Sequence, residues 1–208
     1  VASGSLGVSV GDAEQDCLYG GADLSSCKAA IIGATSGQAA FDDRTNTLTL
    51  DSIDAERVQI GSSRVPASVT VRLVGKNTLS GGIDASNSNG LAIAGSGALT
   101  IDGAQCGIKV GNNARPGKAR SLVVKGGAIT IRNAEDWCIW VRSGNFIMTG
   151  GKVDVSGWGG ILAESKKSNG KKLGGKVQMK GGSLSSVVKG GSGAGAIEAD
   201  SMSNKSSS

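Results

Sequence analysis

Apolar and polar residues alternate along most of this chain, in short runs separated by glycine. The clearest run, Leu91–Asp102, reads apolar-x-apolar, then a Gly-Ser-Gly corner, then apolar-x-apolar again. Strict alternation is the period of a β-strand, because successive side chains of a strand point to opposite faces. The 3.6-residue period of an amphipathic helix does not accompany it. The pattern therefore predicts pairs of short strands that turn at glycine.

The same unit recurs along the chain, which indicates a repeat architecture. Copies of it are Val71–Leu79, Leu91–Asp102, Leu122–Arg132, Phe146–Ser156 and, in degraded form, Val177–Leu184. A third apolar-x-apolar element follows each copy, at Ile83–Ala85, Ile108–Val110, Ile139–Val141, Ile161–Ala163 and Ile197–Ala199. Three short strands per repeat can bury their inward residues only by stacking on the next repeat. We therefore expect an all-β fold, a single-stranded right-handed parallel β-helix.

The repeat also divides the chain. A partial first repeat at 46–60 brings the expected number of coils to about six. Residues 1–45 do not follow the repeat, and we expect them to cap an end where strand edges and core would otherwise be exposed. The β-helix is then expected over 46–200, with a polar tail over 201–208.

Composition removes several kinds of chemistry. Glycine supplies 35 of 208 residues, as corners with positive φ require. Histidine is absent, which excludes Ser-His-Asp, Cys-His and histidine–zinc sites. The longest apolar run, Trp137–Val141, has five residues. A membrane-spanning helix needs about 20, so no membrane span is expected.

Three segments carry a resemblance to a known family: 40–50, 69–79, and the Leu-x-Ile-x-Gly-x-Gly-x-Leu-x-Ile unit at 91–101. Over about residues 40–200 the chain resembles bacterial surface-associated carbohydrate-binding domain-containing proteins, which are similar to the pectate-lyase-like right-handed β-helix superfamily. The resemblance rests on a repeat pattern, so it implies fold more firmly than activity. It implies a secreted or cell-surface bacterial module that binds polysaccharide, in some members with calcium.

Stacked coils convert outward positions into columns, and the third strand has the most informative ones. The first column is Asp84, Lys109, Trp140, Leu162 and Glu198, and the second is Ser86, Gly111, Arg142, Glu164 and Asp200. An indole offers the flat apolar face and N–H on which sugar rings stack. We therefore expect a polysaccharide site made by Trp137, Trp140, Trp158, Arg142, Glu164 and Lys109, in which Arg142 favours acidic sugars. The alternative is that Trp137 and Trp158 pack into the corner and only Trp140 is exposed.

Metal binding and catalysis have weaker support. Asp84, Asn87 and Asn89 offer oxygen ligands for calcium within one turn, although turns favour these residue types for backbone reasons alone. No other cofactor is expected. A lyase would need clustered carboxylates, whereas Asp102 and Asp154 should lie two coils apart, roughly 10 Å. Non-catalytic polysaccharide binding is therefore favoured over a polysaccharide lyase, which remains an alternative of lower weight.

The net charge is +5, and one stretch is strongly basic. It contains Lys166, Lys167, Lys171, Lys172, Lys176 and Lys180. A solvated connection explains such a run, and a patch that binds phosphate or uronate is the alternative. The stretch has no aromatic residue, so a single-stranded nucleic-acid platform is not expected.

The four cysteines lack Cys-x-x-Cys spacing and fit the disulfides of a secreted chain. We expect Cys17–Cys27 in the cap and Cys106–Cys138 between consecutive coils. Cys106 and Cys138 differ by one residue in their offset from the following isoleucine, so their pairing requires a local bulge. Reduced cysteines are the alternative.

The first strand carries an apolar stripe at outward positions, made by Ala92, Val123 and Ile147. Burial of a Val or Ile side chain is worth roughly 1.5–3 kcal/mol, so something should cover this stripe. We expect the cover to be residues 1–45, especially 29–32, or a second subunit in a homo-oligomer. The second case favours a rival function, a structural or adhesive module that contacts protein.

Overall fold

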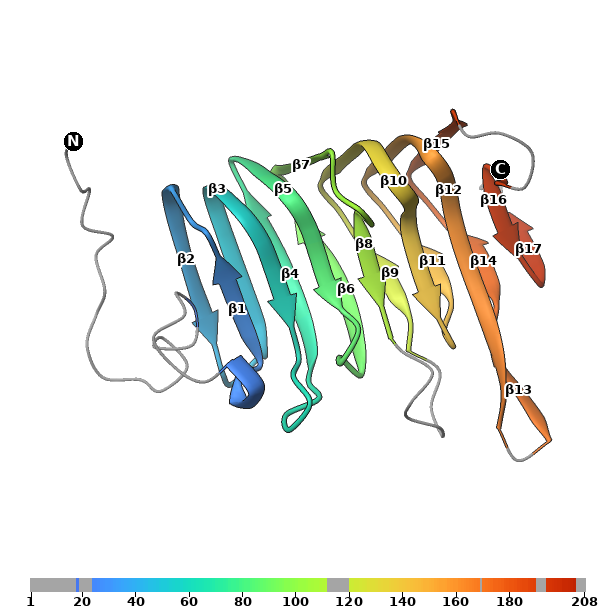
Figure 1. Cartoon of the computed structure of the whole chain (residues 1–208), viewed down its shortest axis with the longest axis horizontal. Helices are drawn as coiled ribbons and strands as arrows, with labels where there is room; N and C mark the ends of the chain where they lie inside the picture. The colour runs from blue at the N-terminus through green and yellow to red at the C-terminus, as the bar shows by residue number, and fades with distance from the viewer. Residues whose placement is uncertain (1–17, 19–23, 112–119, 169, 190–193, 205–208) are drawn as a thin grey trace.

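The computed structural model describes residues 18, 24–111, 120–168, 170–189 and 194–204, and this part of the chain is all-β (Figure 1). Among the described residues from 24 onward it contains one short 3-10 turn, η1 (Leu24–Ser26), and no α-helix. The strands are β1 (Ala29–Ile32), β2 (Ser36–Asp42), β3 (Thr47–Ile60), β4 (Ser68–Val74), β5 (Lys76–Ala85), β6 (Gly90–Gly95), β7 (Ala98–Asp102), β8 (Ile108–Val110), β9 (Leu122–Val124), β10 (Ala128–Arg142), β11 (Phe146–Met148), β12 (Lys152–Ser168), β13 (Lys171–Gly174), β14 (Lys176–Met179), β15 (Ser183–Val188), β16 (Ile197–Ala199) and β17 (Ser201–Asn204).

Parallel pairing joins these strands into three ladders. The first ladder runs β3-β4-β6-β9-β11-β14-β17. The second runs β3-β5-β7-β10-β12-β15, and the third runs β3-β5-β8-β10-β12-β16. The long strands β3, β5, β10 and β12 contribute to more than one ladder because the chain bends within them. A sheet dominated by parallel pairs is compatible with the β-helix that the repeats predict.

Residues of like kind stack in register along each ladder and form the core. Leu91, Leu122, Phe146 and Val177 follow one another in the first ladder, each 2% exposed or less. The second ladder stacks Leu99, Ile129 and Val153, and the third stacks Ile83, Ile108, Ile139 and Ile161. The inward positions expected from period-two alternation are therefore confirmed for these residues.

The N-terminal end of the core is closed by antiparallel strands. β1 pairs with Arg57–Ile60 at the edge of the third ladder, and β2 pairs with the preceding part of β3. Ala29, Ala30 and Ile31 are buried there. The expectation that residues 29–32 cover the stripe of Ala92, Val123 and Ile147 is therefore wrong. An unpaired strand edge satisfies its backbone groups by adding a strand, and that requirement decides where β1 lies.

The C-terminal end differs from the sequence expectation in its last strand. Ser201–Asn204 forms β17, parallel to β14, although a polar tail was expected from 201. Met202 continues the column of Val177, which explains the strand. The lysine-rich segment forms an antiparallel hairpin of β12 and β13 that projects from the body of the molecule (Figure 1).

Membrane insertion through a helix has no support in the part of the chain that the structure describes. None of the described residues forms a helix with the length and apolar character needed to cross a bilayer.

Candidate functional site

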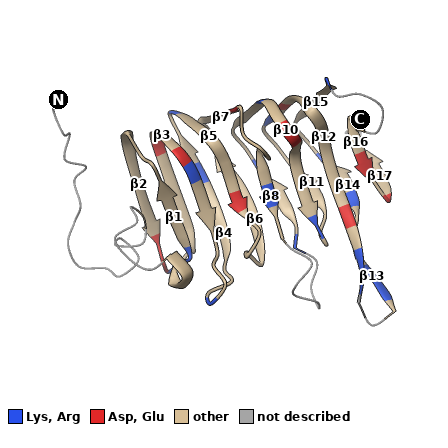
Figure 2. Ribbon diagram, viewed as in Figure 1, with Lys and Arg blue, Asp and Glu red and all other residues tan. Residues whose placement is uncertain are grey.

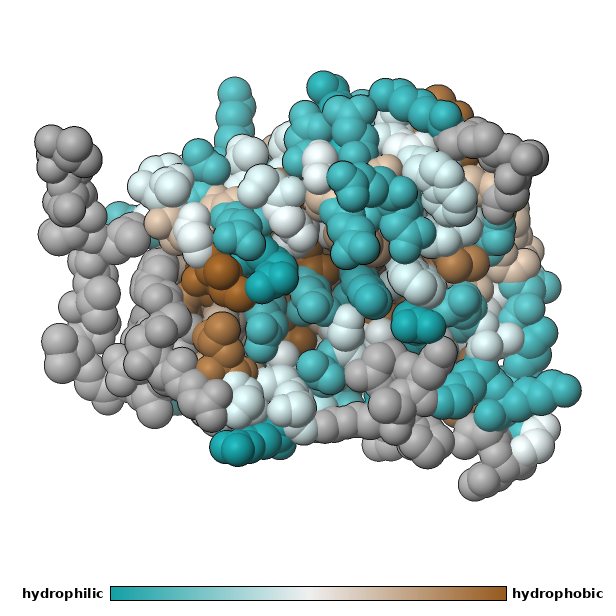
Figure 3. Space-filling model, in the orientation of Figure 1, coloured by the Kyte–Doolittle hydropathy of each residue, from teal (hydrophilic) through white to brown (hydrophobic). Residues whose placement is uncertain are grey.

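The third ladder places the predicted outward columns in register. Asp84, Lys109, Trp140, Leu162 and Glu198 occupy successive paired positions from β5 to β16. In the neighbouring column Arg142 of β10 lies directly beside Glu164 of β12. Figure 2 shows positive and negative segments on adjacent strands of this ladder. Hydrophilic side chains dominate the middle of the face shown in Figure 3, and hydrophobic ones gather near β1.

Trp140 is the centre of a cluster of four side chains. Its indole Nε1 donates a hydrogen bond to Glu164 Oε2 over 2.9 Å. Arg142 Nε lies 3.3 Å from the same oxygen, and its guanidinium carbon lies 4.4 Å from the centroid of the indole ring. Lys109 Nζ lies 5.2 Å from that centroid. Glu164 therefore fixes the indole and the guanidinium at once, while two cations lie over the ring.

This arrangement changes what Trp140 can offer a ligand. The ring is half-buried and already in contact with Arg142 and Lys109, so it is not a bare stacking surface. What the cluster presents is a planar guanidinium, an ammonium group and a carboxylate held in a fixed geometry. Such groups donate to and accept from the hydroxyls of a polar ligand.

Trp137 and Trp158 form a separate edge-to-face pair. Their ring centroids are 5.9 Å apart at an interplanar angle of 87°. Trp137 is 7% exposed, and its ring lies against Gly159, where an added Cβ would be 2.7 Å from the ring carbon Cε3. Trp158 is 41% exposed. The structure thus divides the six predicted residues into the Trp140 cluster and this pair, with Trp137 serving the packing and Trp158 reaching solvent.

An open groove continues from the Trp140 cluster toward the end of the ladder. Glu164 lines it together with Leu162, Ser165, Glu198 and Asp200, and its volume is about 590 Å³. Asp200 forms an ion pair of 2.9 Å with Lys172. Hydrogen bonds from Ser165 and Lys172 hold the pKa of the Asp200 carboxyl below its ordinary value.

Sequence reasoning did not place Ser165 in this groove, or Lys172 beside the Asp200 that lines it. Both belong to the β12–β13 hairpin, whose antiparallel pairing brings Lys172 back toward the ladder. The Ser-Asn-Gly sequence at 168–170, a turn signal flanked by a lysine pair on each side, was the available signal.

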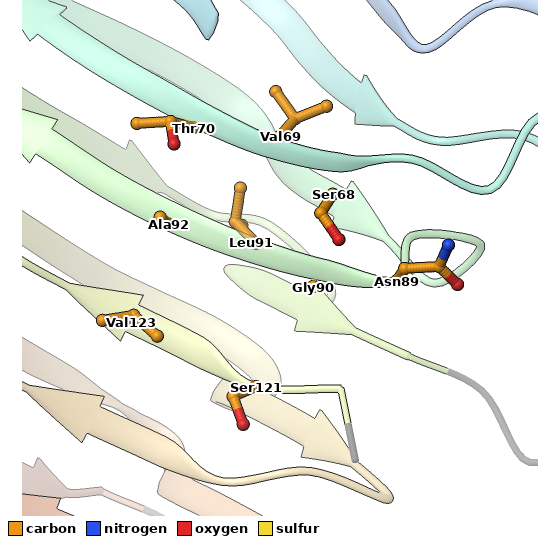
Figure 4. Close-up of a pocket in the computed structure, with 9 residues that line it drawn as sticks. All are labelled: Ser68, Val69, Thr70, Asn89, Gly90, Leu91, Ala92, Ser121 and Val123. Atoms are coloured by element: carbon orange, nitrogen blue, oxygen red, sulfur yellow. The ribbon is translucent and has the colours of Figure 1, made fainter. Parts of the chain in front are cut away.

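The first ladder carries a second hollow, of about 290 Å³ (Figure 4). Its floor includes Thr70, Ala92 and Val123, one from each of three paired strands, and Ser68 and Ser121 lie at one side. The column continues to Ile147 on β11. Ala92, Val123 and Ile147 are each half-buried, and none of the described residues before Ser68 lines the hollow.

The three calcium candidates do not converge on one point. Asp84 Oδ1 accepts a hydrogen bond of 2.9 Å from the backbone N–H of Ser86, which is a turn-forming contact. The amide of Asn89 donates to the carbonyl of Pro66 over 2.7 Å. Asp84 and Asn87 line the same small hollow of about 200 Å³, with a single carboxylate between them. This set fits calcium poorly, because the ion takes six to eight oxygens.

The second ladder separates the carboxylates that a lyase would need to bring together. Asp102 lies beside Arg132, whereas Asp154 lies beside Thr130 on a later strand. Asp102 accepts a hydrogen bond of 2.8 Å from Asn133. Among the described residues, no group of three or more Cys, Asp and Glu side chains is placed to hold a metal ion.

One of the two expected disulfides, Cys106–Cys138, is absent. Cys106 and Cys138 are both free thiols. The N–H of Gly107 donates to the carbonyl of Trp137, so Cys106 lies beside Trp137 and Cys138 lies beside Gly107. The bulge that the pairing required is absent between β8 and β10, and the one-residue offset sends the two sulfurs to opposite faces. Cys27 is buried and disulfide-bonded, and its expected partner Cys17 lies outside the described residues.

Comparisons of the chain with models of known protein families, with curated proteins and with solved structures gave no match. The assignment of a function therefore depends on the geometry described above.

Proposed function

We propose that the three ladders form a right-handed parallel β-helix of about six coils, of the pectate-lyase-like kind. The protein is, in this proposal, a non-catalytic polysaccharide-binding module of a secreted or cell-surface bacterial protein. The observation that carries the proposal is the Trp140 cluster, in which Glu164 Oε2 holds both the indole N–H and the Arg142 guanidinium.

An extended polar ligand suits this face better than a compact one. The cluster lies on a ladder of in-register strands and continues into the open groove lined by Glu164, Glu198 and Asp200. Side chains recur there at the spacing between strands, about 4.8 Å, so a chain of repeating units can make similar contacts on successive strands. Rigidly held donors and acceptors reduce the entropy that binding costs.

The test is calorimetric titration of the protein with neutral glucans, chitin-type glycans and polygalacturonate. Arg142→Ala should weaken binding by about tenfold or more, because a hydrogen bond to a charged group contributes about 1.5–3 kcal/mol. Trp140→Ala should weaken binding to a similar extent, because it removes the ring and the N–H that position Arg142 and Glu164. Thr130→Ala is the matched control, since it is a half-buried outward residue of the same strand on another ladder. Absence of binding across the panel, or full affinity in Trp140→Ala, would contradict the proposal.

A second candidate function is a structural or adhesive module, and the last strands favour it. β15, β16 and β17 each pair on one side only within the described chain. β15 and β17 carry no charged residue, and Val187 and Met202 are 53% and 64% exposed. Edges without protective charges are templates for added strands. Val187→Lys, at an exposed position that does not line the groove beside Glu164, should then abolish protein adhesion and leave glycan binding unchanged, and retained adhesion would remove this candidate.

A further inference from the structure

Positive charge is concentrated in one part of the sequence. Between Glu164 and Glu198 the chain holds seven lysines and no Asp, Glu or Arg. The rest of the chain then has 15 of the 22 Lys and Arg residues against all 17 Asp and Glu. The whole basic excess of the protein therefore comes from this segment.

The β12–β13 hairpin collects four of these lysines in a small space. Lys167 pairs directly opposite Lys172, while Lys166 and Lys171 occupy the alternate positions of the two strands. Because alternate residues of a strand point to opposite faces, each face of the hairpin carries two lysines. Figure 2 shows the hairpin as a positive projection from the body of the molecule. Asp200, which lies outside the hairpin, pairs with Lys172.

The placement of Lys167 directly opposite Lys172 is unfavourable for the isolated hairpin. Like charges directly opposite each other in an antiparallel pair destabilise it. The same placement raises the local positive potential, which an anionic ligand would neutralise. A ligand that contacts both faces must be a chain that wraps the hairpin, because a flat membrane surface reaches one face at a time.

The residue types indicate the chemistry of the anion. All four cations are lysines, which bind phosphate as compact point charges, and the segment has no arginine, whose planar fork binds carboxylate or phosphate in a bidentate geometry. The hairpin has no aromatic side chain, so it offers no platform on which nucleic-acid bases can stack.

We propose that the β12–β13 hairpin binds a linear phosphate polymer without bases, of the polyphosphate or poly(glycerol phosphate) kind. This site goes beyond the proposed polysaccharide function and does not use Trp140. Lys167 and Lys171, one on each face of the hairpin, are central to it.

The experiment measures binding of the full chain to inorganic polyphosphate and to poly(glycerol phosphate) at several salt concentrations. Contacts from Lys167 and Lys171 should give a slope of log affinity against log salt of about −1.4 or steeper, at about −0.7 per contact for a single strand. The double variant Lys167→Gln/Lys171→Gln should reduce the affinity at low salt by about tenfold or more and make the slope shallower by about 1.4. Both residues project on a hairpin outside the core, so the fold should persist, which circular dichroism checks.

The matched control is Lys125→Gln/Lys152→Gln, which removes the same charge from exposed positions outside the hairpin turn, at the corner after β9 and at the first residue of β12. It should keep most of the affinity for polyphosphate. Trp140→Ala should also keep it, so failure of the glycan proposal and failure of this one are distinguishable. Equal losses in the two double variants would overturn the proposal. Binding of polygalacturonate or single-stranded DNA as tight as that of polyphosphate, or binding only to anionic lipid vesicles, would also overturn it.

Discussion

Asn77 is a polar side chain in a column of apolar ones, and its contacts explain why. It precedes Leu99 and Ile129 in the second ladder and is 1% exposed. Its Oδ1 accepts from the N–H of Ile53, and its Nδ2 donates to the carbonyls of Val74 and Ala98. The side chain thus satisfies three backbone groups on three different stretches of chain.

Asn77→Ala should therefore destabilise the protein by about 3 kcal/mol or more, since each buried backbone group left unpaired costs about 1–3 kcal/mol. Chemical denaturation monitored by tryptophan fluorescence measures the change. Thr78→Ala, at the adjacent exposed position, is the control and should change the free energy of unfolding by less than about 0.5 kcal/mol. A loss below 1 kcal/mol in Asn77→Ala would show that these backbone groups find other partners.

The two free thiols make stability depend on pH in the alkaline range. Desolvation, followed by the nearby Asp136 carboxylate, raises the pKa of Cys106 to about 12. Desolvation raises the pKa of Cys138 to about 11. An unfolded thiol titrates near 8.5, so between these values the folded state holds protons that the unfolded state has lost.

The resulting stabilisation should be complete below about pH 8.5 and should decline as the pH rises toward 11 and 12, by on the order of a few kcal/mol. Denaturation at pH 8 and at pH 10.5 measures the decline. The variant Cys106→Ser/Cys138→Ala should show a weaker decline, which separates the thiols from tyrosine and lysine. Rapid reaction of Cys138 with a thiol reagent in the native Cys106→Ser variant at pH 8 would contradict the burial of Cys138.

At the scale of strands and corners, glycine is required for two different reasons, a left-handed backbone conformation and a lack of space for a side chain. Gly95 ends β6 with φ of +101°, and a Cβ there would lie 2.2 Å from the carbonyl oxygen of Leu73. Gly103 follows β7 with φ of +76°, and a Cβ there would meet no atom within 4 Å. The first position needs a small residue and a left-handed backbone, whereas the second needs only the backbone conformation.

This pair of glycines separates the two costs experimentally. Gly103→Ala should cost about 1–2 kcal/mol, the strain of a non-glycine residue in the left-handed region. Gly95→Ala should cost clearly more, because the neighbouring strand must also move. Thermal unfolding of both variants measures the difference, and equal losses would show that the β4–β6 contact yields without cost.

For the whole molecule, the open question at the first ladder is what covers Ala92, Val123 and Ile147. The described N-terminal strands β1 and β2 pair with β3 instead, the rest of the expected cover, residues 1–17 and 19–23, lies outside the described residues, and a second subunit is the alternative that can be tested directly. Light scattering should then show an oligomer for the wild type and a monomer for Val123→Asp, because a carboxylate in an apolar interface loses its hydration. Thr130→Asp, on the second ladder, is the control. A wild-type monomer whose melting temperature is unaffected by Val123→Asp would show that the stripe faces solvent.

Much of the arrangement followed from the sequence because parallel repeats that stack in register convert alignment into contact. Once Ile108 and Ile139 were equated, Lys109 had to lie beside Trp140. In the same way, equating Ile139 with Ile161 placed Arg142 beside Glu164. Period-two alternation and glycine corners are local properties, and they identified the buried columns for the same reason.

Tertiary structure decided what local patterns do not encode. The positions of Lys109 and Arg142 over the Trp140 ring depend on rotamers chosen by packing across strands. The free state of Cys106 and Cys138 depends on a register that would have needed a bulge. The segment Ala29–Ile32 pairs with the edge of β3, and the lysine-rich segment folds back as the β12–β13 hairpin. In each case the outcome depends on contacts between residues far apart in the sequence, or on backbone groups that had to find a partner, and neither is visible in a window of neighbouring residues.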